Sequence, residues 1–452
     1  MDFSNATVII KQFLSGKHEY NQAAFISGIP GMGKTYAALN FCAQNKDSLY
    51  FSFKNIDSSF ALRVFCDAYP DVFGICSDWH GFFDKLKIYG KEKRPTVLFD
   101  NAGERNDKDE FYSELRSFLE NNTDTAIIML GRPWEQIDIP CNEYVLQPIS
   151  TQEIADLFSV SDVDAVNIYC LTSGMPALLA LYNTSLSFEE NAKAMLNTHS
   201  VFYRLVIDWM RECFRTPETY NTLLYAMANG NNRVSELAKF SGYPKNKCDK
   251  YIKALCEYGL VCKVPGKNGH TKYYPTNSYL SLWYKVLLTA MPNGDGNFDE
   301  EVYKRFMQHF SSTVLSDFYK SVCYYWVEQN LQSDFVERVD TKDEAYRDIK
   351  IGDITFGFVF NNRSHIYVYF DTVFGNNLNR KLWDEIEKVT TKDHPFYENE
   401  YYVLTVNRVP DSYWKLSKTY DNVHIVSPKM LFSTFNENYK KIKRPRFVPS
   451  FV

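Results

Sequence analysis

The chain has 452 residues, and at about 150 residues per domain this length indicates three domains. An apolar content of 45% is enough for several hydrophobic cores. The formal net charge of −5 excludes a polyelectrolyte that binds nucleic acid over its whole surface, so any such contact requires a local basic segment.

Cysteine usage and hydropathy indicate the compartment. Ten cysteines are scattered from Cys42 to Cys323 without a Cys-x-x-Cys pair or the His spacing of a zinc site, which is typical of reduced core residues in a cytosolic protein. The first residues include an acid, and no run of 18 apolar residues occurs anywhere. We therefore expect a cytoplasmic protein without membrane contact.

Residues 28–35 match the phosphate-binding pattern Gly-x4-Gly-Lys-Ser/Thr, between an apolar strand at 23–27 and a helix-forming run at 36–43. In such a loop, backbone N–H groups surround the phosphates, the lysine reaches the β- and γ-phosphates, and the hydroxyl binds Mg²⁺. The motif predicts a site for a nucleoside triphosphate with Mg²⁺. The expected nucleotide contacts are Gly28, Ile29, Pro30, Gly31, Met32, Gly33, Lys34, Thr35 and Tyr36.

Strand-like and helix-like patterns alternate through the first 150 residues, which predicts a parallel sheet covered by helices. The expected strands are 23–27, 49–53, 96–100 and 125–130, with a helical stretch through Trp79 and Phe83 after the second. The carboxyl ends of parallel strands form the ligand crevice of such a sheet. Asp100 and Arg132 follow two of these strands and should converge on the phosphates.

Each of these two residues has an alternative role. Asp100 either holds Mg²⁺, together with Thr35, or caps a turn at the end of its strand. Arg132, in Leu-Gly-Arg-Pro-Trp134, either contacts the γ-phosphate or forms a surface ion pair.

The residue after Asp100 is Asn101, where many P-loop ATPases have a second acid. An amide can position a water molecule but cannot accept its proton, a role worth roughly 10² to 10⁴ in rate. Glu104 either substitutes for the missing acid or is a solvated loop residue. We therefore expect slow hydrolysis, with Lys34, Asp100, Asn101 and Arg132 as the catalytic set.

Residues 149–200 have a helical pattern. Ser150 and Glu153 have the spacing of a capping box, and Pro176 follows Ser-Gly-Met at a first helical turn. This segment predicts a lid beside the nucleotide.

These motifs together resemble the archaeal-type ATPase family, which is related to the signal-transducing ATPases with numerous domains (STAND). The resemblance rests on the phosphate loop, the strand ending at Asp100, Gly131-Arg132, Pro148 before a helix, and Gly174-Met-Pro176. It implies a P-loop ATPase core, a helical lid, a winged-helix domain and a C-terminal domain like a restriction endonuclease. It also implies ATP as nucleotide, γ-phosphate sensing by Arg132, and an adenine-side or hinge contact for Pro176.

Residues 201–288 have the order of a winged helix-turn-helix, with helices near 216–227, 232–240 and 245–258 and a hairpin at 260–264 and 271–275. Eight lysines stand between positions 239 and 272 against Asp249 and Glu257. They either bind DNA phosphates, form a solvated face, or accompany packing against the ATPase core. The candidates for nucleic-acid contact are Lys245, Lys247, Lys250, Lys253, Lys267 and Lys272.

The C-terminal third has a helical stretch from 300 to about 330 and strand-like runs at 354–360, 366–370 and 401–406, with a helix expected at 381–389. Asp353 stands where a restriction-type nuclease has its first acid, but the next strand lacks the acid-x-Lys pair that binds metal and steadies hydroxide. We expect this α/β domain to be inactive.

The predicted fold class is α/β, and the predicted domains are a P-loop core at 1–148, a lid at 149–200, a winged helix at 201–288, a linker at 289–300 and a degenerate endonuclease-like domain at 301–452. The favoured function is an ATP- and ADP-binding switch that hydrolyses slowly and controls its other domains, with a protein partner or a second copy as possible targets. The alternatives are an ATP-modulated DNA-binding regulator, a nucleotide-gated nuclease and a scaffold without turnover.

Overall fold

The computed structural model describes residues 5–16, 22–104, 110–121, 124–135, 137, 139–265, 271–331, 336–337, 356–361, 364–371, 380, 383–384, 387–388, 393 and 400–432. The chain divides into two compact units. One comprises residues 1–154, 172–221 and 246–261, and the other comprises residues 155–171, 222–245 and 262–452.

The first unit contains a five-stranded, fully parallel sheet in the order β2-β3-β4-β1-β5. The phosphate loop follows β1, and β4 lies between β1 and β3, with Phe25 beside Met129 and Val97 beside Ile127. The predicted parallel sheet is therefore confirmed, whereas β5 was not predicted. The strands are β1 Ala23–Ser27, β2 Leu49–Ser52, β3 Thr96–Asp100, β4 Ala126–Gly131 and β5 Asn142–Val145.

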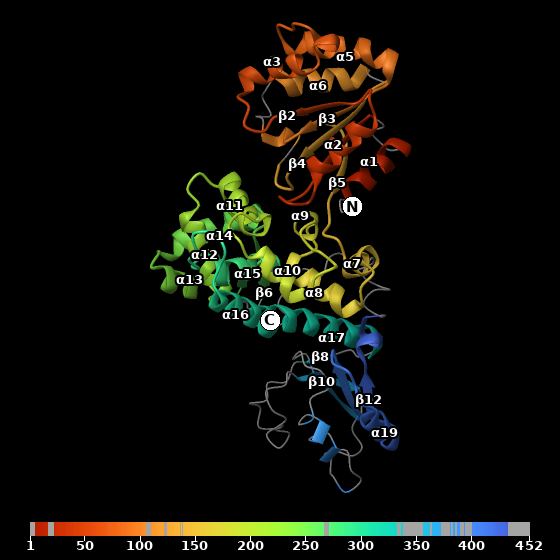
Figure 1. Cartoon of the computed structure of the whole chain (residues 1–452), viewed down its shortest axis with the longest axis vertical. Coiled ribbons are helices and arrows are strands. Elements are labelled where there is room, and N and C mark those ends of the chain that lie inside the picture. The colour runs from red at the N-terminus through yellow and green to blue at the C-terminus, as the bar shows by residue number, and fades with distance from the viewer. Residues whose placement is uncertain are drawn as a thin grey trace. The chain divides into compact units, whose positions relative to one another are not determined.

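Helices cover both faces of this sheet (Figure 1). Three of them, α3, α5 and α6, lie on one side, and α1 and α2 lie on the other. Helix α1 was not predicted, and the stretch expected to run through Trp79 consists of separate helices. The bounds are α1 Asn5–Ser15, α2 Lys34–Gln44, α3 Ser58–Ala68, α4 Pro70–Phe73, α5 Trp79–Lys93 and α6 Glu110–Asn121.

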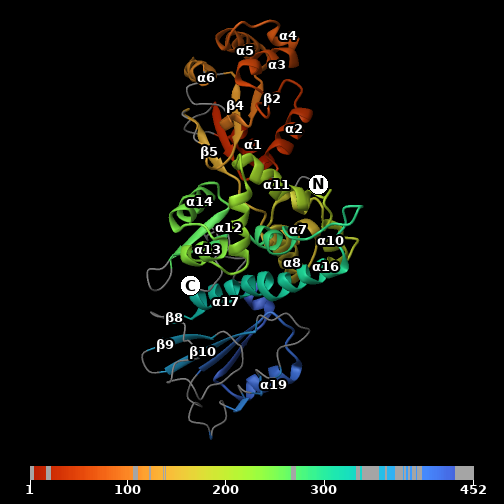
Figure 2. The same ribbon diagram turned by 90° about the vertical axis from the view of Figure 1, so that its left-hand side faces the viewer.

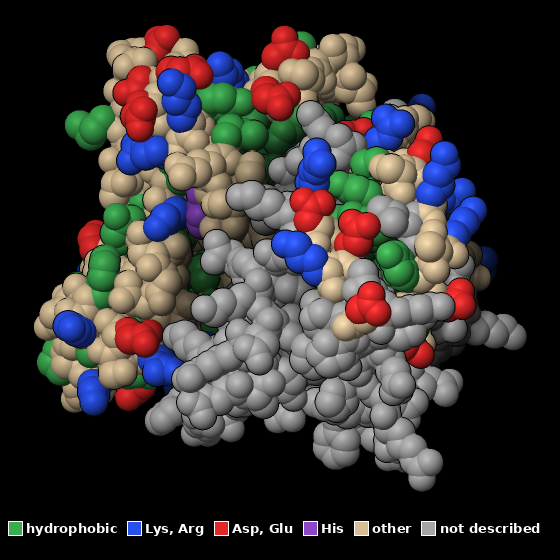
Figure 3. Space-filling model, turned by 90° about the horizontal axis from the view of Figure 1, so that it is seen from below, with side chains coloured by type: hydrophobic (Ala, Val, Ile, Leu, Met, Phe, Trp, Pro, Cys, Tyr) green, Lys and Arg blue, Asp and Glu red, His purple; other side chains and the backbone are tan. Residues whose placement is uncertain are grey.

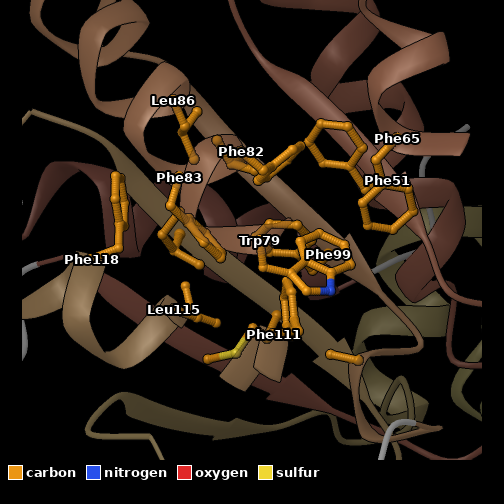
Figure 4. Packing of buried hydrophobic residues seen from close by; sticks show 14 of the residues in the cluster. Phe51, Phe65, Trp79, Phe82, Phe83, Leu86, Phe99, Phe111, Leu115 and Phe118 are labelled. Atoms are coloured by element: carbon orange, nitrogen blue, oxygen red, sulfur yellow. The ribbon is translucent and has the colours of Figure 1, made fainter. Parts of the chain in front are cut away.

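An aromatic cluster fills the space between the sheet and α3, α5 and α6 (Figure 4). Phe51 of β2 stacks on Phe99 of β3 with ring centroids 5.5 Å apart, and Phe73 stacks on Phe82 at 4.2 Å. Trp79 packs edge-on against Phe82 at 5.4 Å. Because the rings interlock in stacked and edge-on pairs, each adds to the stabilisation from buried area. The cluster fixes the strands whose ends carry the candidate site.

The middle of the chain is helical. Ser187 and Glu190 form a capping box at the start of α10, and Pro176 is the first residue of α9. Ser150 and Glu153 make the reciprocal bonds of the predicted capping box before α7. The bounds are α7 Thr151–Phe158, α8 Asp162–Thr172, α9 Pro176–Leu179, α10 Phe188–Met195 and α11 Val201–Cys213.

The elements predicted for a winged helix occur in the expected order, each within three residues of its predicted bounds. Strands β6 and β7 pair as a two-stranded sheet. The bounds are α12 Glu218–Ala228, α13 Val234–Ser241, α14 Lys245–Glu257, β6 Val261–Pro265 and β7 Thr271–Pro275. The domain boundaries given above stay predictions.

The second unit contains a mixed sheet in the order β12-β11-β10-β9-β8. Strand β10 is antiparallel to β9 and parallel to β11. Figure 2 shows the long helix α17, and α19 beside the sheet. The bounds are α15 Ser278–Leu282, α16 Glu300–His309, α17 Ser316–Asn330, β8 Val336–Glu337, β9 Phe356–Asn361, β10 Ser364–Asp371, β11 Glu400–Thr405, α19 Asp411–Thr419 and β12 Val423–Val426, with π-helical turns at Trp283–Leu287 and Phe310–Leu315.

Two C-terminal predictions depend on residues outside the described ranges. Asp353 is one of them, and most of the helix expected at 381–389 is another.

Within the described residues, no helix is both long and apolar enough to span a bilayer. On the face drawn in Figure 3, Lys and Arg side chains are interspersed with Asp and Glu over the described surface.

Truncating Phe82 should destabilise the P-loop sheet strongly. The ring is fully buried among five aromatic neighbours, so Phe82→Ala should cost about 3–5 kcal/mol through lost transfer energy and a residual cavity. Hydrogen exchange of the β3 amides in urea would measure this loss. Ile88→Ala, on the exposed face of the same helix, should change the free energy of unfolding by less than about 0.5 kcal/mol. Equal effects of the two substitutions would contradict the assignment of this core.

Candidate functional site

The phosphate loop has the backbone shape that its sequence predicts. Gly31 and Gly33 have φ values of 86° and 79°, in the left-handed region that glycine adopts without steric cost. Helix α2 begins at Lys34, so its N-terminal N–H groups and positive dipole end face the loop. Gly28 N–H donates to the Gly131 carbonyl at 3.2 Å, which ties the loop to β4.

The segment around Pro176 contacts this loop directly. The N–H of Ala177 donates to the Gly31 carbonyl at 3.0 Å. A Cβ at Gly31 would lie 2.9 Å from Leu205 of α11 and from Met175. Glycine at this position therefore permits both the positive φ and the close approach of α9 and α11.

Lys34 is held by its own loop. Its Nζ donates to the carbonyl of Gly28 and to that of Ile29 at 3.3 Å. Burial lowers the pKa of Lys34 to about 8, although the negative charges of Asp100 and Glu135 oppose this shift. Among the described residues, no carboxylate is hydrogen-bonded to Lys34, and a desolvated ammonium of this kind fits a phosphate oxygen as partner.

Asp100 is buried at the end of β3 and accepts two hydroxyl hydrogen bonds on one oxygen. Thr35 Oγ1 donates to its Oδ2 at 2.6 Å, and Tyr50 Oη donates to the same atom at 2.8 Å. Burial, then the charge of Asp100, raises the pKa of the Tyr50 hydroxyl, which therefore stays a donor. The adjacent Thr35 and Asp100 oxygens are the hard ligands that Mg²⁺ prefers, and phosphate oxygens and water would complete its octahedron. These residues fit the predicted MgATP.

The Asn101 side chain lies on the β2 side of Asp100. Its Nδ2 donates to Ser52 Oγ at 3.4 Å, and its N–H donates to Asp100 Oδ1 at 2.9 Å. The residue has φ 55°, a left-handed conformation that Asn tolerates better than most residues. Because β2 is the edge strand and the phosphate loop follows β1, this amide is directed away from the loop.

Arg132 lies between two carboxylates. Its guanidinium is 3.3 Å from Glu135 Oε1 and 3.0 Å from Glu212 Oε2, and its side chain is only 14% exposed. Glu212, near the end of α11, also pairs with Lys54 at 3.3 Å. The ion pair foreseen as the alternative role of Arg132 is thus present, but it is largely buried.

Glu135 is a buried acid that the sequence analysis did not single out. Its side chain is 8% exposed, and its Oε2 accepts the N–H of Arg132 at 2.6 Å. Burial raises the pKa of Glu135, while Arg132 and Lys34 act in the opposite direction. One feature of the sequence could have identified it: Glu135 follows shortly after β4, a strand whose carboxyl end lies at the edge of the sheet where ligands bind.

Two glycines make room for the Glu135 carboxylate. A Cβ at Gly103 would lie 2.3 Å from Glu135 Cδ, and a Cβ at Gly131 would lie 2.6 Å from Glu135 Oε2. Gly103 belongs to the turn Ala102–Glu104 after β3, and Gly131 ends β4. The carboxylate therefore lies between the ends of these two strands.

The other residues predicted to contact nucleotide or nucleic acid lie on several elements. Tyr36 is exposed on α2, and Pro176 is buried at the start of α9. Lys245, Lys250 and Lys253 are exposed on α14, which buries Cys248, Ile252 and Leu255. Lys247 and Lys272 are half-buried, and Lys267 lies outside the described residues.

The end of α14 packs near the phosphate loop. Tyr258 meets Trp134 edge-on, with ring centroids 5.2 Å apart, and meets Phe214 at 5.0 Å. Phe214 in turn stacks on Tyr220 at 3.6 Å, and Tyr220 contacts Tyr251 at 4.7 Å. We call these five rings the aromatic relay; they join the Arg132 segment, α11, α12 and α14.

Comparisons with known proteins give distant matches. No family model matches the chain. An uncharacterized protein of Methanocaldococcus jannaschii is 21% identical over 315 residues, which cover 64% of this chain and 70% of the relative.

Three solved structures align with part of the chain. A STAND protein with a tetratricopeptide repeat sensor from Pyrococcus horikoshii has a TM-score of 0.29 and 15% identity, over 67% of this chain and 45% of its own, so the chain spans less than half of that protein. A RuvB variant of Thermotoga maritima has a TM-score of 0.28 and 13% identity, over 67% and 92% of the two chains. A structure of Drosophila ORC bound to AT-rich DNA and Cdc6 has a TM-score of 0.23 and 11% identity, over 61% and 88%.

Because these TM-scores are below 0.5, the alignments do not establish a shared overall fold. The fold class rests on this chain's own features, namely the parallel order β2-β3-β4-β1-β5 and the glycine-rich loop between β1 and α2. The chain is an α/β protein with a P-loop NTPase sheet, and this fold implies nucleotide binding.

The affinity for ATP should fall as the pH rises above 8. Phosphate binding requires a protonated Lys34, and with its pKa lowered to about 8 only about a tenth of the free protein carries that charge at pH 9. Calorimetry in EDTA, which keeps metal out of the measurement, should therefore show about tenfold weaker binding at pH 9 than at pH 7. Lys34→Ala should bind weakly without this dependence, and the exposed-lysine control Lys46→Ala should retain it. The same slope in Lys34→Ala would rule out Lys34 as its source.

Proposed function

We propose that the chain is a nucleotide-dependent switch of the archaeal-type ATPase kind. In this proposal MgATP binds at the phosphate loop and is hydrolysed slowly, and the nucleotide state biases the winged-helix and C-terminal segments between two arrangements. Slow turnover is expected because Asn101 stands where many P-loop ATPases have an acid. The observation that carries the proposal is the sharing of Arg132 by Glu135 and Glu212.

A γ-phosphate would compete with Glu212 for Arg132. The guanidinium can form bidentate, charge-assisted bonds to either group, but it cannot serve both fully. If it turned to phosphate, the remaining ion pair of Glu212 within the described part of the chain would be the one with the exposed Lys54. Binding of the γ-phosphate would thereby remove one of the ion pairs that hold the end of α11.

The aromatic relay could carry that change onward from α11. Phe214 directly follows the helix, and its ring contacts both Tyr220 and Tyr258. A shift of the end of α11 would therefore alter the packing against α14, the third helix of the predicted winged helix. Couplings between sites typically amount to about 1–3 kcal/mol, which one partly buried ion pair can supply.

Glu212→Gln should tighten ATP binding and leave ADP binding unchanged. The substitution removes the carboxylate that competes for Arg132, and only ATP has the γ-phosphate that would use the released guanidinium. We expect about 5- to 10-fold stronger ATP binding by calorimetry, a change of about 1–1.4 kcal/mol. The matched control is Asp208→Asn, an exposed acid on the same helix, which should leave both affinities unchanged. A parallel gain for ADP would contradict competition at the γ-phosphate.

Hydrogen exchange tests the switch itself. Amides of α11 and α14 should exchange at different rates with ATP and with ADP in the wild type, and this difference should disappear in Lys34→Ala. Identical exchange in the two nucleotide states, with both nucleotides bound, would favour a scaffold without switching.

A second candidate function is DNA binding through α14. It is favoured by the exposure of Lys245, Lys250 and Lys253 opposite the buried face of that helix. Each phosphate neutralised should steepen the dependence of log K on log salt by about 0.9. If the three lysines bind DNA, their joint substitution by glutamine should flatten that slope by two to three units; an affinity for duplex DNA that does not vary with salt would exclude this role.

A further inference from the structure

The chain lacks an acid after Asp100, yet it has a buried acid in the same region. Asn101 bonds Ser52 on the edge strand, away from the phosphate loop. Glu135 follows β4, the strand that separates β3 from β1. It therefore lies between the strand that ends with Asp100 and the strand that leads into the loop.

The surroundings of Glu135 are those of a built site. Gly103 and Gly131 leave the space that its carboxylate fills, and a Cβ at either position would enter that space. Two cations act on the carboxylate, Lys34 of α2 and Arg132 of its own segment. Cys213 of α11 also interacts with Glu135, but burial raises the pKa of its thiol to about 12, so it stays neutral. The negative charges of Asp100 and Glu212 act on Lys34, and the charge of Lys34 acts on Glu135.

We propose that Glu135 is the general base of ATP hydrolysis in this protein, in place of the acid missing at position 101. The inference rests on the proposed function and deepens it by naming the group that accepts the proton. The attacking water forms a bond from its oxygen to the γ-phosphorus and gives a proton to the Glu135 carboxylate. The bond from the γ-phosphorus to the β–γ bridging oxygen breaks, and its electron pair leaves with ADP.

The same contacts explain why turnover would be slow. While Arg132 donates two hydrogen bonds to Glu135, the carboxylate is a weaker base, because a nearby cation favours its ionised form. Movement of the guanidinium toward the γ-phosphate removes one of these bonds and restores basicity. Burial, which raises the pKa of the carboxyl, is then opposed less strongly, by the Arg132 N–H bond and the charge of Lys34. Proton acceptance is thereby tied to the arrival of ATP.

The decisive variant is Glu135→Gln, which keeps the shape and the acceptor for the Arg132 N–H but cannot take a proton. At saturating MgATP we expect kcat to fall about 10²-fold while the Kd values of ATP and ADP stay within about twofold. The wild-type rate should decline as the pH falls through the pKa of Glu135, because the protonated carboxyl accepts no proton. That acid limb should be absent from the residual activity of the variant.

Two further variants separate catalysis from structure. Glu135→Asp retains a carboxylate and should recover part of the rate together with the acid limb. Glu143→Gln, an exposed acid on β5, should leave the rate and the limb unchanged. If Glu135 only positioned Arg132, Glu135→Gln and Arg132→Met would both weaken ATP binding, and the acid limb would persist.

The outcomes distinguish this inference from the function on which it rests. A wild-type protein that binds ATP without hydrolysing it would overturn the role of Glu135 and leave the switch standing. A Glu135→Gln protein that keeps more than about a third of the wild-type rate would also overturn it. Failure of the wild type to bind any adenine nucleotide would remove the proposed function, and with it the inference.

Discussion

The candidate site depends on the largely buried guanidinium of Arg132, which forms ion pairs with carboxylates from distant parts of the chain. Arg132 joins Glu135, three residues away, to Glu212, which is 80 residues away in sequence. Removing one partner from such a group leaves an uncompensated charge, which is much costlier than losing an exposed ion pair. A phosphate entering this network would thus redistribute several interactions at once.

Tight packing on both sides of the phosphate loop restricts which parts of the site can move. The aromatic cluster holds β2 and β3 against α3, α5 and α6, so the ends of the strands keep their spacing while side chains at their tips exchange partners. On the other side of the loop, the Ala177 N–H and Leu205 fix Gly31 against α9 and α11. Four of the five rings of the aromatic relay are only partly buried, so they are the contacts with most room to adjust.

The sequence was sufficient for the parts of the molecule that depend on local patterns. Strand alternation, the glycine loop and the strand ending at Asp100 predicted the parallel sheet, since each is a run of neighbouring residues. Helix α1 was missed although Ala6, Ile10 and Phe13 recur at helical spacing, and β5 was missed because it is a short, half-exposed edge strand. The ion pair of Arg132 with Glu212 could not be predicted for a different reason. Glu212 has no distinguishing sequence pattern, and only folding brings it beside the guanidinium. The roles assigned to the site residues stay predictions.

The left-handed backbone at Asn101 limits how this site could be altered. A glutamate at position 101 would have to adopt a positive φ, which residues other than glycine, asparagine and aspartate rarely do. Its side chain would also extend toward Ser52, as that of Asn101 does. Grafting the commoner acid onto the chain would consequently create a misdirected carboxylate instead of a faster enzyme. Under the proposed mechanism, weakening the hydrogen bonds from Arg132 to Glu135 would raise the rate more directly.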